Sequence, residues 1–296
     1  MRHRSVLPVL LALTMLVAVP AADVRAEGID HTLLSAIDEG NYENVEFALA
    51  AGADVNAADQ YVGTALIRAS ALGRTRIVRA LLARGADIHA ADSGGRTALT
   101  LSAWNGHNEV VKELLTNGAQ INVQDAHGGS PLMYASSYGH PNVVKTLIKA
   151  GADVNLRDTT DGSALTRASA NGTLAIVRAL LDAGAQINIQ QKGGWTPLIV
   201  AAWSGRVDVA QALLDSGAEL ETRDDYGRTA LILAADHGHV PMIELLLNAG
   251  ASRDAVDSEG HTPLEAARIS GHTEAVDLLT RWPLTSAEPL GPEGRR

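Results

Sequence analysis

The chain has 296 residues, a formal net charge of −10 and no cysteine. The acidic balance argues against a nucleic-acid partner, because a negatively charged protein repels the phosphate backbone. The lack of cysteine excludes disulfides, thiolate nucleophiles and cysteine-ligated zinc. Since phenylalanine occurs once and 46% of the residues are hydrophobic, the core has to be built from small aliphatic side chains, which suits closely packed short helices.

Residues 1–26 have the pattern of an export signal. The basic segment "MRHR" precedes the apolar run "SVLPVLLALTMLVAV", and small residues precede Glu27, as in a signal peptide. We expect cleavage after Ala26, with Ala21 as the alternative site and an uncleaved membrane anchor as the alternative fate. The apolar run is too short to span a bilayer stably, so we expect no membrane insertion after cleavage. The sequence therefore predicts a periplasmic or secreted protein, and export without cysteine favours the bacterial periplasm.

The rest of the chain repeats itself every 33 residues. A glycine that stands in "AGADVN", "NGAQIN" or a related segment recurs at this step, and so does a hydroxyl residue followed two positions later by leucine. The glycines are Gly52, Gly85, Gly118, Gly151, Gly184, Gly217 and Gly250. The hydroxyl residues are Thr64, Thr97, Ser130, Ser163, Thr196, Thr229 and Thr262. Seven copies in register are the signature of stacked structural units.

Each copy predicts a turn and two short antiparallel helices. The hydroxyl residue is a suitable N-cap for the first helix, proline follows it in three copies, and Glu265 can complete a capping box with Thr262. A glycine suited to positive φ ends this helix. These glycines are Gly73, Gly106, Gly139, Gly172, Gly205, Gly238 and Gly271. The second helix carries paired aliphatics such as Val110 and Val111, and one copy cannot bury its apolar face alone, so the copies must stack.

These units resemble the ankyrin repeat. "DAHGGSPLMYASSYGHPNVVKTLIKAGADVN" (125–155) and "DSEGHTPLEAARISGHTEAVDLL" (257–279) follow the family pattern most openly. The resemblance implies an all-α solenoid of helix-turn-helix units with short turn or β-hairpin fingers. We expect an N-terminal capping repeat at 27–58, seven repeats in one continuous solenoid at 59–283 and a disordered tail at 284–296. The family's "TPLH" histidine is missing from every copy, and we expect more apolar packing at that slot.

Comparing the copies with one another shows which positions the stack leaves free. One such slot holds Ala71, Trp104, Ser137, Ala170, Trp203, Asp236 and Ile269. In the ankyrin family, slots of this kind and the finger tips line the concave face that partners contact. Tryptophan and tyrosine beside arginine are typical of protein-binding hot spots. The predicted partner-binding residues are Tyr61, Arg96, Trp104, Tyr138, Trp195, Trp203, Tyr226, Arg228 and His237. The alternative is that each ring fills space over the next copy's first helix, and one ring can do both.

Catalytic constellations do not emerge from the sequence. The histidines of the family's "GH" slot are expected to be structural; they are His107, His140, His239 and His272. His237 and His239 form an H-x-H that would need a third ligand such as Asp236 to hold a metal. Ser130 and Ser163 are caps without the surroundings of a nucleophile. We therefore expect no catalytic residues, no metal and no cofactor. Two further arginines on the first helices are expected either to form ion pairs in the groove or to contact an acidic partner; they are Arg68 and Arg167.

The resemblance implies a monomeric, non-enzymatic scaffold or modulator that binds a protein through its concave face. Protection or inhibition of a periplasmic enzyme is one such role. The sequence leaves open an immunity protein against a toxin, a secreted effector or metal-dependent enzyme with its site in the groove, and a purely structural envelope protein.

Overall fold

The computed structural model describes residues 21–59 and 63–282. Most of the expected signal segment, the expected tail at 284–296 and the candidate residue Tyr61 lie outside these ranges. Both expected cleavage positions, Ala21 and Ala26, fall on the first described helix. The signal peptide and the tail therefore stay predictions.

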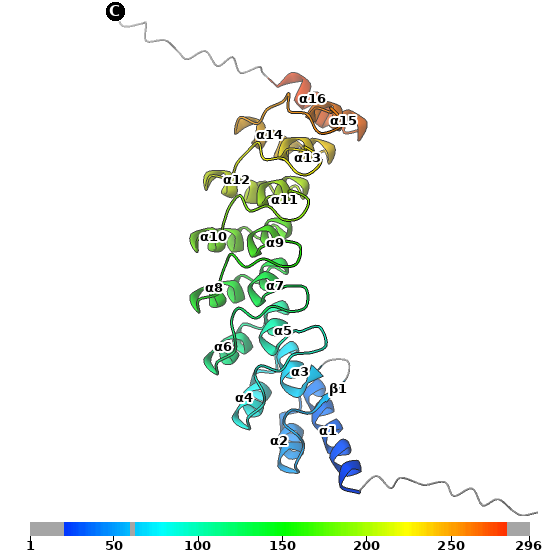
Figure 1. The fold of residues 1–296 in the computed structure, drawn as a ribbon, viewed down its shortest axis with the longest axis vertical. Coiled ribbons are helices and arrows are strands. Elements are labelled where there is room, and N and C mark those ends of the chain that lie inside the picture. Colours follow the sequence, from blue (N-terminus) through cyan, green and yellow to red (C-terminus); the bar gives the residue numbers. More distant parts are fainter. Residues whose placement is uncertain (1–20, 60–62, 283–296) are drawn as a thin grey trace, which may run out of the picture.

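The described residues form eight successive pairs of antiparallel helices (Figure 1). The first helices of the pairs are α1 (Ala21–Glu39), α3 (Ala65–Ala71), α5 (Ala98–Trp104), α7 (Pro131–Ser137), α9 (Ala164–Asn171), α11 (Pro197–Trp203), α13 (Ala230–Asp236) and α15 (Pro263–Ile269). The second helices are α2 (Tyr42–Ala50), α4 (Thr75–Ala83), α6 (Asn108–Thr116), α8 (Pro141–Lys149), α10 (Leu174–Asp182), α12 (Val207–Asp215), α14 (Val240–Asn248) and α16 (Thr273–Arg281). In the first finger, β1 (Ala58–Asp59) pairs antiparallel with β2 (Gly63–Thr64). The predicted all-α solenoid with short hairpin fingers is confirmed.

Local sequence signals start and end these helices as predicted. The hydroxyl residue of each of the seven copies caps the first helix by accepting a hydrogen bond from the backbone N–H three residues later. Pro131, Pro197 and Pro263 occupy the first helical turn, and the Thr262–Glu265 capping box forms. All seven glycines that follow the first helices have positive φ, between 65° and 88°. The helix boundaries are therefore encoded within each copy.

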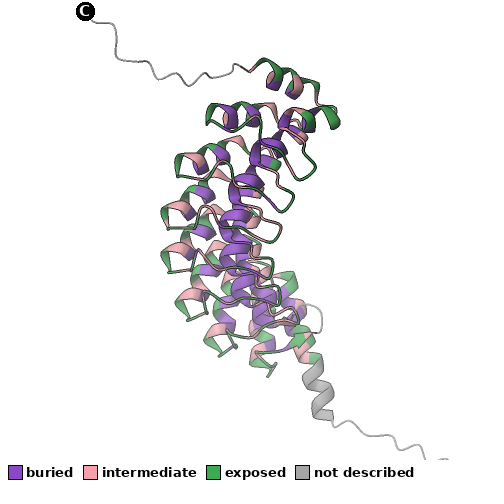
Figure 2. Ribbon diagram, turned by 45° about the horizontal axis from the view of Figure 1, so that its top comes forward, coloured by how far each residue is buried: buried purple, intermediate pink, exposed green. Residues whose placement is uncertain are grey.

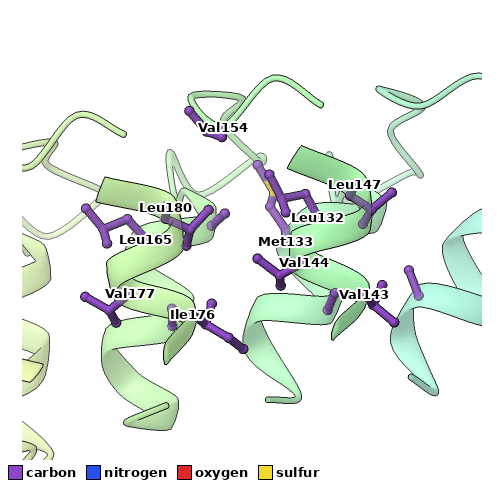
Figure 3. Close-up of a cluster of buried hydrophobic side chains, with 14 of the residues drawn as sticks. Leu132, Met133, Val143, Val144, Leu147, Val154, Leu165, Ile176, Val177 and Leu180 are labelled. Carbon is purple, nitrogen blue, oxygen red and sulfur yellow. The ribbon is translucent and has the colours of Figure 1, made fainter. Parts of the chain in front are cut away.

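The core runs along the whole stack and is built from aliphatic side chains. Each first helix contacts the first helix of the next pair, and each second helix contacts the next second helix. Figure 3 shows this packing around Leu132, Met133 and Leu165, which are at most 2% exposed. Burying a side chain of this size stabilises the fold by about 1.5–3 kcal/mol. Because burial depends on the neighbouring copy, the repeats stabilise one another.

The stack is curved, with the odd-numbered helices and the finger loops on its concave side (Figures 1 and 2). Figure 2 shows that the buried residues concentrate in the odd-numbered helices, between the fingers and the outer layer. The fingers are joined to one another by backbone hydrogen bonds, for example from the N–H of Asp225 to the carbonyl of Gly193 at 3.0 Å. This arrangement fixes the spacing of side chains that project from successive fingers.

The four "GH" histidines join neighbouring repeats, as expected. The Nε2 atoms of His107, His140, His239 and His272 lie 2.8–3.0 Å from the carbonyl oxygens of Ala71, Trp104, Trp203 and Asp236 in the preceding repeat. Arg74 and Arg206 make the same connection in two other repeats. The structural role predicted for the four histidines is thereby confirmed.

The slot of the missing "TPLH" histidine is apolar in only some copies. Buried Ile67, Met133, Ile199 and Ile232 fill it there. The expectation of apolar packing is wrong for three others. They are Thr100 and Thr166, whose hydroxyls contact those of the cap residues at 3.2 and 3.3 Å, and Glu265, which serves the capping box.

Candidate partner-binding surface

The C-terminal ends of the odd-numbered helices and the finger loops form a surface that we call the inner face. Its first feature is a group of three stacked rings at α5 and α7. We call this group the α5–α7 stack. The ring of Trp104 lies 4.5 Å from that of Tyr134 and 4.9 Å from that of Tyr138, with interplanar angles of 19° and 22°. Tyr138 is 49% exposed, whereas Tyr134 is 9% exposed. The stack therefore joins the core to the surface.

Tyr134 anchors this stack from below. Its hydroxyl donates a 2.5 Å hydrogen bond to Oδ2 of Asp125. Burial, together with the neighbouring Asp125 carboxylate, raises the pKa of Tyr134 to about 12, so the phenol stays protonated and remains a donor. The sequence did not indicate Tyr134, because this residue stands within the first helix, four residues after the cap Ser130, at a slot that holds arginine, leucine, valine or alanine in the other copies.

A second group of rings lies across α11 and α13, the α11–α13 cluster. Trp195 and Trp203 meet edge to face, with ring centroids 5.8 Å apart, and Trp203 meets His237 at the same distance. His237 stacks on His239 at 6.0 Å. Trp195 is half-buried against the core, but Trp203 is 45% exposed. Trp203 therefore packs against its neighbours with part of its ring and exposes the remainder to solvent.

The predicted arginines of the inner face are already paired. Arg96 binds Oδ2 of Asp92 at 2.8 Å, and Arg228 binds Oδ2 of Asp224 at 2.8 Å. Each guanidinium also approaches a ring: Arg96 lies 6.0 Å from Trp104, and Arg228 lies 5.8 Å from Trp195 and 5.0 Å from Tyr226. These arginines hold the finger turns and flank the aromatic rings.

The two arginines on the first helices form ion pairs, which was one of the two expected outcomes. Arg68 contacts the carboxylates of Asp38 and Asp59 and is buried. Arg167 donates to Oδ2 of Asp158 at 2.5 Å. Burial would raise the pKa of Asp158, but hydrogen bonds from Thr160 and Arg167 outweigh it and lower the pKa below its ordinary value. Both arginines therefore stabilise carboxylates inside the fingers.

The predicted site residues are divided between two places. The α5–α7 stack contains Trp104 and Tyr138, with Arg96 beside it, and the α11–α13 cluster contains Trp195, Trp203 and His237, with Tyr226 and Arg228 beside it. The space-filling alternative applies best to Trp104 and Trp195, which are only partly exposed. Exposure of 64% at Tyr226 and 45% at Trp203 leaves surface for a partner.

A pocket of about 240 Å³ lies at the C-terminal end of the inner face. We call it the C-terminal pocket. Its lining includes Tyr226, Ile232, Asp236, Glu259, His261 and Ile269. In the sequence, Asp236 and Ile269 are members of a variable slot and Asp236 is a possible third ligand beside His237 and His239, but nothing in the sequence connects them with Glu259, which stands on the next finger.

The histidines and acids of the described part of the chain were candidates for a metal site. Within residues 21–59 and 63–282, no three histidine, aspartate or glutamate side chains are grouped so that they could hold a metal ion. Nδ1 of His237 lies 3.0 Å from the carbonyl of Leu233. In the same ranges, no helix has the length and apolar character needed to cross a bilayer.

The curved stack of helix pairs and its aromatic inner face define a helical repeat protein. The family model for ankyrin repeats (3 copies) matches residues 33–125, 90–158, 132–224 and 217–283. The chain belongs to the ankyrin-repeat family. Among solved structures, 604 chains match, and one similar structure is that of the human ASB11 ankyrin repeat domain. It is 29% identical, covers 72% of this chain and 96% of its own, and has a TM-score of 0.67. No curated protein matches the chain.

Proposed function

We propose that this protein is an exported, non-enzymatic scaffold that binds a partner protein through the inner face. Ankyrin repeats are in general protein-interaction modules, and the family membership supports a protein partner. The observation that carries the proposal is that three exposed rings stand at helix ends or in a finger of the inner face, namely Tyr138 at the end of α7, Trp203 at the end of α11 and Tyr226 in a finger turn. Large exposed rings flanked by arginine are typical of hot spots, and a preformed surface loses little entropy on docking.

Trp203 gives the sharpest test of the inner face. Trp203→Ala removes a half-exposed ring, so we expect it to weaken capture of the partner by about tenfold or more. Phe47→Ala is the matched control, because Phe47 is 66% exposed on α2, outside the inner face. Affinity capture from a periplasmic fraction would identify the partner, and titration would measure both variants. Equal binding by wild type and Trp203→Ala, with loss in Phe47→Ala, would place the interface elsewhere.

Export is proposed from the pattern of residues 1–26. Expression of the full chain in a bacterium, followed by fractionation and N-terminal sequencing, tests it. We expect a periplasmic or secreted product that begins at Glu27, or at Ala22 if the alternative site is used. A product that keeps Met1 and stays with the cytoplasm would refute export while leaving the binding proposal intact.

A further inference from the structure

The C-terminal pocket combines apolar walls with an acidic rim. Its floor is formed by Ile232 and Ala266, which are 1% and 7% exposed. Its walls include Tyr226 and Ile269, which are 64% and 68% exposed. Large apolar side chains that stay this exposed in a defined concavity are suited to covering part of a ligand.

The charged groups of the pocket are mostly carboxylates. Asp236, Asp257 and Glu259 line it, and the cationic side chain beside them is Arg228. Arg228 is engaged by Asp224 through contacts of 2.9 Å and 2.8 Å, so its charge is compensated. Nδ1 of His261 lies 3.5 Å from both Asp257 and Glu259. Three carboxylates therefore line the pocket beside one arginine whose charge is already compensated.

Two of these acids are not shared by the other full repeats, and Oδ1 of one of them, Asp236, accepts a 2.6 Å hydrogen bond from the hydroxyl of Ser270 in the next repeat. Among the seven full repeats, no other has an acid at the slot of Asp236 or of Glu259, although the N-terminal capping repeat has Asp38 at the Asp236 slot. Residues of the other repeats at the Asp236 slot are Ala71, Trp104, Ser137, Ala170, Trp203 and Ile269. Residues of the other repeats at the Glu259 slot are Tyr61, Gly94, His127, Thr160, Gly193 and Tyr226. Their presence together on one pocket is a property of this place in the chain.

An equivalent pocket 99 residues upstream shows the contrast. It is lined by Ser137 and Thr160 in place of Asp236 and Glu259, and Arg167 stands where the C-terminal pocket has Ala266. The guanidinium of Arg167 is a cation within this upstream pocket, and it pairs with Asp158. The C-terminal pocket has the small Ala266 at this position, with no cation of that kind.

We propose that the C-terminal pocket receives a lysine or arginine side chain of the partner protein. The aliphatic stem packs against Ile269 and the Tyr226 ring, and the cationic head lies between the carboxylates of Asp236 and Glu259. Long basic side chains bury their stems on apolar surface and keep the head beside polar groups, and an aromatic face adds a cation–π contribution. This inference rests on the proposed function and names the chemistry that the inner face recognises.

The repeats themselves supply matched variants. Asp236→Ser/Glu259→Thr copies Ser137 and Thr160 of the upstream pocket, so the stack tolerates both residues. The reciprocal Ser137→Asp/Thr160→Glu variant adds two acids at the pocket that contains Arg167. Circular dichroism and urea unfolding check that both variants fold like the wild type.

The probes are blocked octapeptides of glycine and serine with one central lysine, arginine, norleucine or glutamate. Titration into the ¹⁵N-labelled full chain at low salt, followed by NMR, measures binding up to about 1 mM. We expect the lysine and arginine peptides to shift the amides of Ser258, Glu259 and Ile269 and to bind at least about fivefold more tightly than the norleucine peptide. Asp236→Ser/Glu259→Thr should remove this preference, the reciprocal variant should keep it, and salt should weaken it.

Several results would overturn the inference. Equal binding of the lysine and norleucine peptides, no binding by any peptide, or an unchanged preference in Asp236→Ser/Glu259→Thr would each do so. Peptide binding that appears only when Arg295 and Arg296 are replaced by serine would make the chain's own C-terminal end the occupant. Dimerisation that Asp236→Ser/Glu259→Thr abolishes would make the occupant a second copy.

The partner titration separates this failure from failure of the proposed function. If Trp203→Ala weakens partner capture and Asp236→Ser/Glu259→Thr leaves it unchanged, the inner face binds the partner without a basic side chain in the pocket. If neither variant affects capture, the inner face is not the binding surface.

Discussion

Arg167 is the positively charged partner of the buried Asp158 carboxylate in the fourth finger. The carboxylate of Asp158 is 3% exposed, its Oδ1 accepts the backbone N–H groups of Thr160 and Gly162, and its Oδ2 accepts a 2.5 Å hydrogen bond from Arg167. A buried carboxylate without such donors would be strongly destabilising. Arg167 therefore has a structural role on a face where a basic residue could have suggested ligand binding.

In five of the other six full repeats, one side chain at one of two slots pairs with the turn aspartate in the same way. The donor stands either directly before the cap residue or four residues after it. Donors of the first kind are Arg96, Arg228 and His261; donors of the second kind are Arg68, Tyr134 and Arg167. In the remaining repeat the turn aspartate is replaced by Gln191, and Trp195 and Val200 occupy the two donor slots. No repeat has both donors, which indicates that one is sufficient.

The first prediction is that Arg167→Leu destabilises the protein by about 2 kcal/mol. The change copies Leu101 and Leu233 at the same slot, but it leaves the Asp158 carboxylate without its cation. Urea unfolding at neutral pH measures the loss. Arg178→Leu on the exposed side of α10 is the control, and we expect it to change stability by less than about 0.5 kcal/mol.

Gly162→Arg should rescue Arg167→Leu. This second change copies the arrangement of Arg96 and Arg228, and a Cβ at Gly162 would lie 3.0 Å from Oδ2 of Asp158 and 3.2 Å from Oε1 of Gln191, both side-chain atoms. A double variant no more stable than Arg167→Leu would show that the two donor slots are not interchangeable.

The second prediction concerns acid unfolding. Burial would raise the pKa values of Asp158 and Asp257, but hydrogen bonds from Thr160 and Arg167 in one finger, and from the backbone of His261 and Glu259 in the other, lower both. A carboxylate with a lowered folded-state pKa contributes stability above its unfolded pKa of 3.8. That contribution is lost as the pH falls through the folded-state pKa.

The contribution of Asp158 and Asp257 to the free energy of unfolding should therefore be nearly constant from about pH 7 to pH 5. It should decrease below about pH 4. Urea midpoints measured across this range test the profile. Asp158→Asn should lower stability at neutral pH and flatten the acid decline. An unchanged acid decline in Asp158→Asn would mean that other groups dominate it.

The parts of the fold that the sequence predicts are those encoded within one copy. Thr196, Pro197 and Gly205 identify the start and end of α11 because caps and positive-φ glycines act locally. From the sequence, Arg228 was assigned to a partner, and its pairing with Asp224 four residues earlier was not predicted. The alternation of the two donor slots among the copies is the signal that identifies an arginine as structural.

Contacts between copies were less predictable. Trp104 and Trp203 occupy the same slot, yet the ring below Trp104 is Tyr134, which has no counterpart in the other copies. The ring that meets Trp203 is His237. The difference arises from residues of the next repeat, so the slot alone could not show which tryptophan is packed and which is exposed.

The third prediction separates these two tryptophans. Because Trp104 stacks on both Tyr134 and Tyr138, we expect Trp104→Ala to cost about 2–3 kcal/mol. Trp203→Ala should cost less than about 1 kcal/mol, since its ring is 45% exposed. Thermal and urea unfolding of the two variants check this order, and a larger loss for Trp203→Ala would contradict it.

The fourth prediction is that Asp161→Gly stabilises the protein by about 0.5–1 kcal/mol. Within residues 21–59 and 63–282, Asp161 is the sole non-glycine residue with positive φ, at 62°. Five other repeats have glycine at this slot; they are Gly95, Gly128, Gly194, Gly227 and Gly260. Glycine relieves the left-handed strain, although its greater freedom in the unfolded chain offsets part of the gain.

Gly128→Asp provides the opposite change at the same slot. There a Cβ would lie 2.8 Å from the Cα of Asp158, a backbone atom that cannot move freely, so we expect a loss well above the gain from Asp161→Gly. Urea unfolding of both variants measures the two effects. Destabilisation by Asp161→Gly would mean that the 3.6 Å contact between Asp161 and Arg157 outweighs the backbone strain, and that this finger has become adapted to its aspartate.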